Sequence, residues 1–270
     1  MKRSSGVRMC TLAAGGALSL ALITGCSDGS STDPAAAKDS ASTVKALNAA
    51  ELKQRILAQD EVDGYKVNAV GSAAPTRSRI KASDEKCRPL AYVLTGLAPA
   101  DAATEIGRTV REDKKDPTDD ATSLDDMADG KFESALKDSL NLDITSLDLS
   151  SYDGDGAQQA LKALSAAVKD CATGFTGGSA GDEQKVTKVT AAKPSGTGDE
   201  SVAFTAVTDM DGDTGPLHAE VVRHGNTLAT YFTMNIGAMM SGKTYTVPAP
   251  VIKAQLEVPH AADVSVNDTL

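Results

Sequence analysis

The chain has no tryptophan and few other aromatic residues. Its 270 residues include four phenylalanines and five tyrosines. Aromatic rings supply the flat apolar surfaces on which a sugar ring stacks. The composition therefore argues against a carbohydrate-binding platform.

Positive charge is also scarce. The 27 Lys and Arg residues face 37 Asp and Glu, which gives a formal net charge of −10. Nucleic acids and anionic lipid surfaces favour basic partners, so the charge argues against both. From Glu112 to Asp155, fourteen acidic residues face four lysines. This stretch is expected to be a solvated, mobile insertion at about 112–155, with a cation-attracting or partner-binding arm as the alternative.

Long apolar runs are missing except at the N-terminus. There, Lys2, Arg3 and Arg8 precede an uncharged run from Met9 to Ile23. This run of about 15 residues is shorter than the ~20 that a membrane-spanning helix needs. The pattern is typical of a secretory signal peptide at residues 1–25, with an uncleaved signal anchor as the alternative.

The end of this run, Ile23-Thr24-Gly25-Cys26, resembles the lipobox of bacterial lipoproteins, with Ile23 in the place of the usual leucine. The resemblance implies cleavage between Gly25 and Cys26 and a diacylglyceryl lipid, with its palmitate-like chains, on the Cys26 thiol. Several acyl chains on one residue hold a protein stably at a membrane. We therefore expect a lipid anchor on the outer face of the cytoplasmic membrane and a flexible tether at 26–46.

Two of the four cysteines then remain for the exported part of the chain. Cys10 leaves with the signal peptide and Cys26 carries the lipid, which leaves Cys87 and Cys171. A pair of cysteines in an exported domain usually forms a disulfide. The alternative, a pair of metal-binding thiolates, lacks a C-x-x-C motif or a nearby histidine.

Several segments have the periodicity or the caps of helices. Asn48 and Glu51 have capping-box spacing, with Leu47 and Leu52 placed as a hydrophobic staple. The remaining expectations are a helix beginning at Pro89, a weaker one at about 102–111, and one around Phe132, Leu136 and Leu140. The clearest helix follows Asp155, with its apolar stripe at Leu161, Leu164, Val168 and Cys171. The helix with the capping box at Asn48 and Glu51 is expected over about 49–59.

Strand signals dominate the last third. The segments QKVTKVTAA, ESVAFTAVT, PLHAEVVRH and TLATYFTMNI are rich in β-branched residues. Between the last two, Gly225-Asn226 has the signature of a type II′ hairpin. This turn places residue 221 opposite 230 and gives one apolar face, with His218, Glu220 and Tyr231 on the other. That second face is predicted to be solvated, with metal or ligand binding by His218 and Glu220 as the alternative.

These elements predict an α+β fold in which an antiparallel sheet from the C-terminal third packs against helices from the N-terminal two thirds. We expect a single domain at 47–262 and a short tail at 263–270.

Three motifs suggest chemistry that their surroundings do not support. GAMMSGKT at 237–244 matches a phosphate-binding loop, but Pro248 and Pro250 follow where the helix should run, so we expect a connecting loop and no nucleotide. Ser179 stands in a G-x-S-x-G motif that follows a helix, which predicts a loop residue rather than a catalytic serine. The segment from Asp209 to Glu220 has calcium-loop spacing but Thr214 where the turn needs glycine, so a turn between strands is expected and weak calcium binding is the alternative.

The layout of lipobox, acidic tether, helices, paired cysteines and a terminal antiparallel sheet with VVRHGNTLATYFTMN resembles small exported lipoproteins of actinobacteria. It is more distantly similar to the extracellular sensor domains of actinobacterial Ser/Thr kinases. The resemblance implies a non-catalytic binding or sensor-like module of the cell envelope, without a metal or other cofactor and with a small molecule, lipid or protein as its ligand. Two alternatives remain open, a carrier of a lipid or other apolar ligand and a cell-wall hydrolase.

Overall fold

The structure is a computed structural model that describes residues 44–71, 75–114, 139–210 and 213–258. The predictions that fall outside these ranges are the signal peptide at 1–25, the lipid on Cys26, the tether up to residue 43, the helix around Phe132 and Leu136, and the tail at 263–270.

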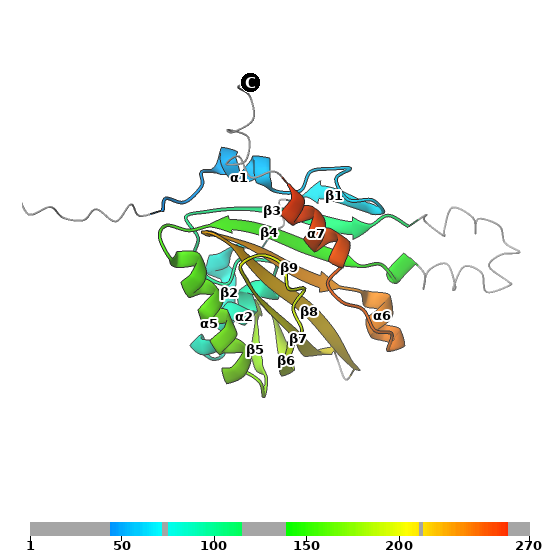
Figure 1. The fold of residues 1–270 in the computed structure, drawn as a ribbon. Helices are drawn as coiled ribbons and strands as arrows, with labels where there is room; N and C mark the ends of the chain where they lie inside the picture. The colour runs from blue at the N-terminus through cyan, green and yellow to red at the C-terminus, as the bar shows by residue number, and fades with distance from the viewer. Residues whose placement is uncertain (1–43, 72–74, 115–138, 211–212, 259–270) are drawn as a thin grey trace, which may run out of the picture. The chain divides into compact units, whose positions relative to one another are not determined.

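The described residues form a nine-stranded antiparallel sheet with the order β1-β3-β4-β9-β8-β7-β6-β5-β2 (Figure 1). The strands are β1 (Tyr65–Ala69), β2 (Ile80–Ala82), β3 (Thr104–Glu112), β4 (Ile144–Ser151), β5 (Phe175–Ser179), β6 (Asp182–Ala192), β7 (Glu200–Met210), β8 (Asp213–His224) and β9 (Thr227–Met234). The two edge strands, β1 and β2, are neighbours in the sequence although they lie at opposite edges of the sheet. Of the seven strands between them, β3 comes from the first half of the chain and the other six come from the second half.

The predicted fold class is therefore wrong. The sheet makes up most of the fold, and its strands do not all come from the C-terminal third. The main error is β3, which the sequence suggested as a weak helix at about 102–111. Ile106 and Val110, four residues apart, fit a helix as well as a strand. Val110 packs in the core with Ile106 against it, because β3 pairs with both β1 and β4. These long-range pairs override the weak local preference.

The hairpin of β8 and β9 has the predicted register. Val221 pairs with Thr230, and Ala219 pairs with Phe232. Gly225 has a φ of 57°, a left-handed conformation that the first central position of a type II′ turn requires. The local turn thus sets the side-chain alternation of two long strands.

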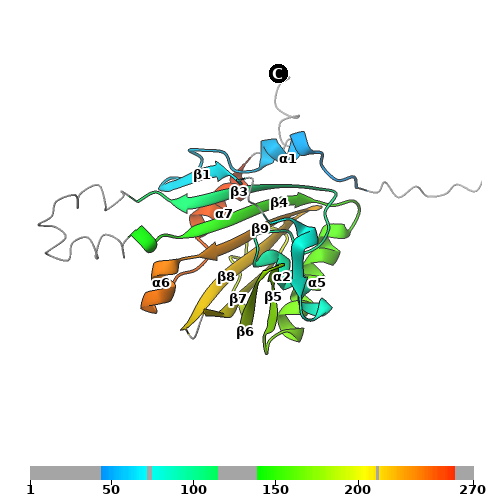
Figure 2. The same ribbon diagram turned by 180° about the vertical axis from the view of Figure 1, so that it is seen from behind.

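Around β4 and β9 the sheet is covered on both faces, which corrects the prediction of one solvated face. Helices α2 (Arg88–Val93) and α5 (Gly156–Asp170) cover one face, and α1 (Ala49–Arg55) and α7 (Ala249–Glu257) lie on the other (Figures 1 and 2). Phe204 and Leu228 belong to the first core, whereas Leu147 and Tyr231 belong to the second. Tyr231, expected to face water, has an exposed fraction of 0%.

The helical predictions with strong local signals are confirmed, though two helices are shorter than expected. Asn48 and Glu51 close the predicted capping box at the start of α1, which ends at Arg55. The helix opened by Pro89 ends at Val93. Helix α5 buries the predicted stripe, including Leu161 and Leu164.

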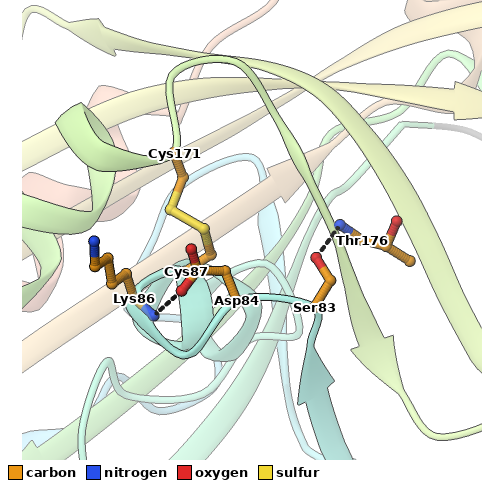
Figure 3. Close-up of a disulfide and its surroundings, with 6 residues drawn as sticks. All are labelled: Ser83, Asp84, Lys86, Cys87, Cys171 and Thr176. Carbon is orange, nitrogen blue, oxygen red and sulfur yellow. Dashed lines mark hydrogen bonds between the residues drawn. A yellow bond between two sulfur atoms is a disulfide. The ribbon is translucent and has the colours of Figure 1, made fainter.

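The predicted cysteine pair is present as a disulfide between Cys87 and Cys171 (Figure 3). Cys87 ends the short 3-10 helix at Glu85–Cys87 just before α2, and Cys171 is the C-cap residue of α5. Both cysteines are almost fully buried. The bond therefore joins the two helices that cover the first face of the sheet.

Candidate functional site

An apolar cavity of about 390 Å³ lies between the first face of the sheet and the helices α2 and α6 (Ile236–Ser241). Its walls come mainly from β5, β6, β8, β9 and these two helices. The apolar lining comprises Ala91, Leu94, Phe175, Val186, Leu217, Phe232, Met234, Ile236 and Met239. Ser179, Asp182, Gln184 and Thr208 add a polar part of the wall.

Small residues in β5 leave room for this cavity. Gly177 and Gly178 line it without side chains. A Cβ atom on Gly177 would lie 2.9 Å from both the Lys81 carbonyl oxygen and the Phe175 ring. The glycine is therefore needed for the close approach of β2 and for the position of the Phe175 ring.

The cavity opens at α6. The Asn235 side chain caps this helix by accepting a hydrogen bond from the Ala238 N–H at 2.8 Å. Ile236 lines the cavity and is nevertheless 45% exposed, so the wall reaches the surface here. Met240 is the next exposed apolar residue on α6, at 75%.

A larger hollow of about 670 Å³ lies along α5 and the start of β7. It is more open, and its lining includes Asp155, Gln158, Lys162 and Glu200. Ligand sites are usually concave and mostly apolar. The smaller apolar cavity therefore fits a binding site better.

The segment GAMMSGKT is part of this apolar site and is not a phosphate loop. Residues 236–241 form α6, so the helix precedes Lys243 instead of beginning there. Gly242 ends it with a φ of 67°. The predicted connecting loop is thus mostly helical, and Met239 contributes to the cavity wall.

Ser179 is the last residue of β5, not a loop residue as predicted. It lines the apolar cavity, and the strand β6 follows it after a turn. A nucleophile elbow needs a helix after the serine. His218 lies on the opposite face of the sheet, where its ring packs on Tyr245, so it does not approach Ser179.

His218 and Glu220 each contact other residues of the fold. Burial lowers the pKa of His218, and its Nδ1 lies 3.2 Å from the Thr205 hydroxyl. Glu220 is 4% exposed and accepts a hydrogen bond from the Ser195 N–H at 2.8 Å. Within residues 44–71, 75–114, 139–210 and 213–258, no group of three His, Cys, Asp or Glu side chains could hold a metal ion. Of the predicted calcium loop, Asp209 and Met210 end β7 and residues 213–220 belong to β8, while residues 211–212 lie outside the described ranges.

A second, smaller cavity contains a buried carboxyl that the sequence analysis did not single out. It measures about 210 Å³ and is lined by Asp148 with parts of β3, β4 and the turn after α2. Burial raises the pKa of Asp148 well above its usual value and Glu105 adds to this, whereas Arg77 and a hydrogen bond with Ser150 lower it. The signal in the sequence was the alternation of Leu147 and Leu149 with polar residues, which marks a strand whose polar side chains share one face.

The comparisons with known proteins do not assign a family. No protein-family model matches the chain, and no curated protein matches it. Among solved structures, the extracellular domain of PknH from Mycobacterium tuberculosis matches with a TM-score of 0.42 and 12% sequence identity. The match covers 79% of this chain and 99% of that domain.

This neighbour is the extracellular domain of a mycobacterial Ser/Thr kinase, the class of domain that the sequence distantly resembles. A likeness at this TM-score carries no argument about ligand or activity. Among the described residues, no helix is long and apolar enough to cross a membrane.

Proposed function

We propose that the chain is a lipid-anchored, non-catalytic binding module on the outer face of the cytoplasmic membrane, and that it binds an apolar ligand. The apolar cavity of about 390 Å³ carries the proposal. Its volume lies within the usual range for small-molecule sites, roughly 300 to 1,000 Å³. This favours the carrier-like alternative within the broader class of binding modules.

The arrangement of the lining suits a ligand that is mainly apolar with one polar end. Phe175, Leu217 and Phe232 provide apolar contact, while Asp182 and Gln184 lie at the polar part of the wall. Removing apolar ligand surface from water contributes about 25 cal/mol per Å². An acyl chain or a similar hydrophobic molecule would gain most from this cavity.

The residues that line the cavity together with Ser179 support a non-catalytic role. Ser179 and Asp182 both line the cavity, but none of the described lining residues is a histidine. A serine hydrolase needs a base within hydrogen-bond reach of the nucleophile. The hydrolase alternative therefore has no supporting geometry at this site.

Binding of an apolar ligand in this cavity is tested with matched variants of two neighbouring residues. Met239→Trp places a bulky ring in the cavity wall, whereas Met240→Trp places it on the exposed side of α6. The full chain and both variants are purified from membranes and extracted with organic solvent, and apolar molecules are quantified by mass spectrometry against the protein. Wild type and Met240→Trp should carry the same molecule, and Met239→Trp should lose most of it. Equal amounts in all three proteins, or none in the wild type, would contradict the proposal.

The lipid anchor rests on the lipobox-like residues and has its own test. Cys26→Ala should abolish incorporation of radiolabelled palmitate and should release the protein or leave its precursor uncut. Unchanged incorporation would show that the lipid is attached elsewhere.

A further inference from the structure

The small cavity at β3 and β4 combines a buried carboxyl with missing hydrogen-bond donors. Asp148 lines this cavity and is 4% exposed. Its Oδ1 atom has no hydrogen-bond partner among the described residues. A buried polar group without a partner costs about 1 to 3 kcal/mol, so such atoms commonly indicate a bound water or ligand.

The residues opposite this carboxyl on the neighbouring strands give Oδ1 no hydrogen bond. On β3, Gly107 lies directly opposite Asp148 and offers no side chain. On β9, Thr230 lies opposite it, and the Thr230 hydroxyl also lacks a partner among the described residues. Neither of the two residues opposite Asp148 therefore supplies a donor to Oδ1.

The nearby guanidinium groups are already engaged. Arg77 donates to the Ala98 carbonyl at 3.0 Å and to Glu105 at 3.1 Å, and it pairs with Asp101 at 3.3 Å. Arg108, which lines the cavity, donates to the carbonyl oxygens of Leu57 and Gly107, both at 3.0 Å. When the Asp148 carboxyl is ionised, Oδ1 is an acceptor, so the group that would satisfy it in that state is a hydrogen-bond donor.

We propose that this cavity is a second binding site, for a small free molecule that carries a primary ammonium group held by Asp148. The group would donate to Oδ1, and its charge would compensate the ionised carboxylate. Glu105 lines the same cavity and adds negative charge at the rim. A cavity of about 210 Å³ has space for such a ligand, since a water molecule in the liquid takes roughly 30 Å³.

Binding would be coupled to loss of a proton. The ammonium ion binds the carboxylate, so the proton that Asp148 carries in the empty site passes to the solvent. Below the pKa of Asp148, apparent affinity should therefore rise about tenfold per pH unit, because it follows the fraction of the competent form. The titratable and charged groups around Asp148 are Glu105 on β3, Arg77 in the short 3-10 helix before β2, Arg108 at the lining and Tyr152 after β4.

The probe is methylammonium, compared with tetramethylammonium, which has the charge without N–H donors, and acetamide, which has donors without the charge. Calorimetric titration of the full chain in two buffers of different ionisation enthalpy measures both affinity and proton release. We expect methylammonium alone to bind with release of a proton. Saturable binding of the other two with equal affinity, or no binding of methylammonium, would overturn the proposal.

Two variants assign the effect to this site. Asp148→Asn keeps the shape of the side chain but cannot ionise, so affinity should fall at least tenfold and proton release should disappear. Glu220→Gln alters a buried carboxylate on the opposite face and should bind methylammonium like the wild type, as should Met239→Trp. If Asp148→Asn does not fold, the comparison of the three probes on the wild type still decides. Absence of an apolar ligand from the wild type, with methylammonium binding intact, would refute only the function proposed for the larger cavity.

Discussion

Asp148 and Thr230 face each other across β4 and β9, and each has a buried side-chain oxygen without a hydrogen-bond partner among the described residues. The pair lies in the middle of the sheet, where apolar side chains would stabilise the fold more simply. A buried polar group without a partner is destabilising. The site is therefore expected to influence stability as well as binding.

The first prediction concerns the pH dependence of this site. Because burial raises the pKa of Asp148 above the usual 3.8, the folded protein retains a proton that the unfolded chain loses. The free energy of unfolding should then decrease as pH rises from about 4 through the folded-state pKa. Asp148→Asn should remove this decrease and stabilise the protein at neutral pH by roughly 1 to 3 kcal/mol.

Urea unfolding of both proteins at several pH values measures this difference. Asp153→Asn, on a residue that accepts a hydrogen bond from the Ala46 N–H in an exposed contact, serves as a surface carboxylate control. A larger loss of stability for Asp148→Asn at neutral than at acidic pH would mean that the carboxylate is ionised and paired in the fold.

The second prediction compares two buried tyrosines. The Tyr231 hydroxyl is buried without a partner among the described residues, whereas the Tyr245 hydroxyl donates to the Pro216 carbonyl. Tyr231→Phe should leave stability unchanged or raise it by up to about 1 kcal/mol, and Tyr245→Phe should lower it by about 1 kcal/mol. Thermal unfolding of the two variants provides the measurement, and a clear destabilisation by Tyr231→Phe would imply a hydrogen bond to its hydroxyl.

The third prediction concerns the disulfide. Cys87 and Cys171 are 84 residues apart, so the bond restricts a long loop in the unfolded chain. Replacing both with alanine should lower the free energy of unfolding by up to about 4 to 5 kcal/mol on the chain-entropy estimate. Reductant should destabilise the wild type by a similar amount and leave the double variant unchanged. Insensitivity of the wild type to reductant would show that the bond does not form in the isolated protein.

Local signals in the sequence were sufficient for some elements. The capping box at Asn48 and Glu51, the stripe of α5 and the turn at Gly225 each depend on residues close together in the chain. Such features follow from local geometry, and the structure contains them.

The errors come from contacts between distant segments. Nothing near Ile106 or Val110 tells that β3 pairs with β1 and β4, so these residues fitted a helix equally well. Tyr231 was expected to face water because its strand alternates, but helices on the second face cover it. Asp148 lies within an acidic stretch that suggested solvent, although β4 is an internal strand of the sheet. Burial on both faces is a property of the assembled layers, which local alternation does not report.

Both edges of the sheet come from one segment, residues 65–82, because β1 and β2 follow each other in the chain. These edge strands have five and three residues, while the strand β3 beside β1 has nine. Short edge strands limit the pairing of one molecule with another. If this segment detached, β3 and β5 would become the edges, and the exposed β3 would be long enough to template aggregation. The two short strands β1 and β2 thus protect both edges of the sheet.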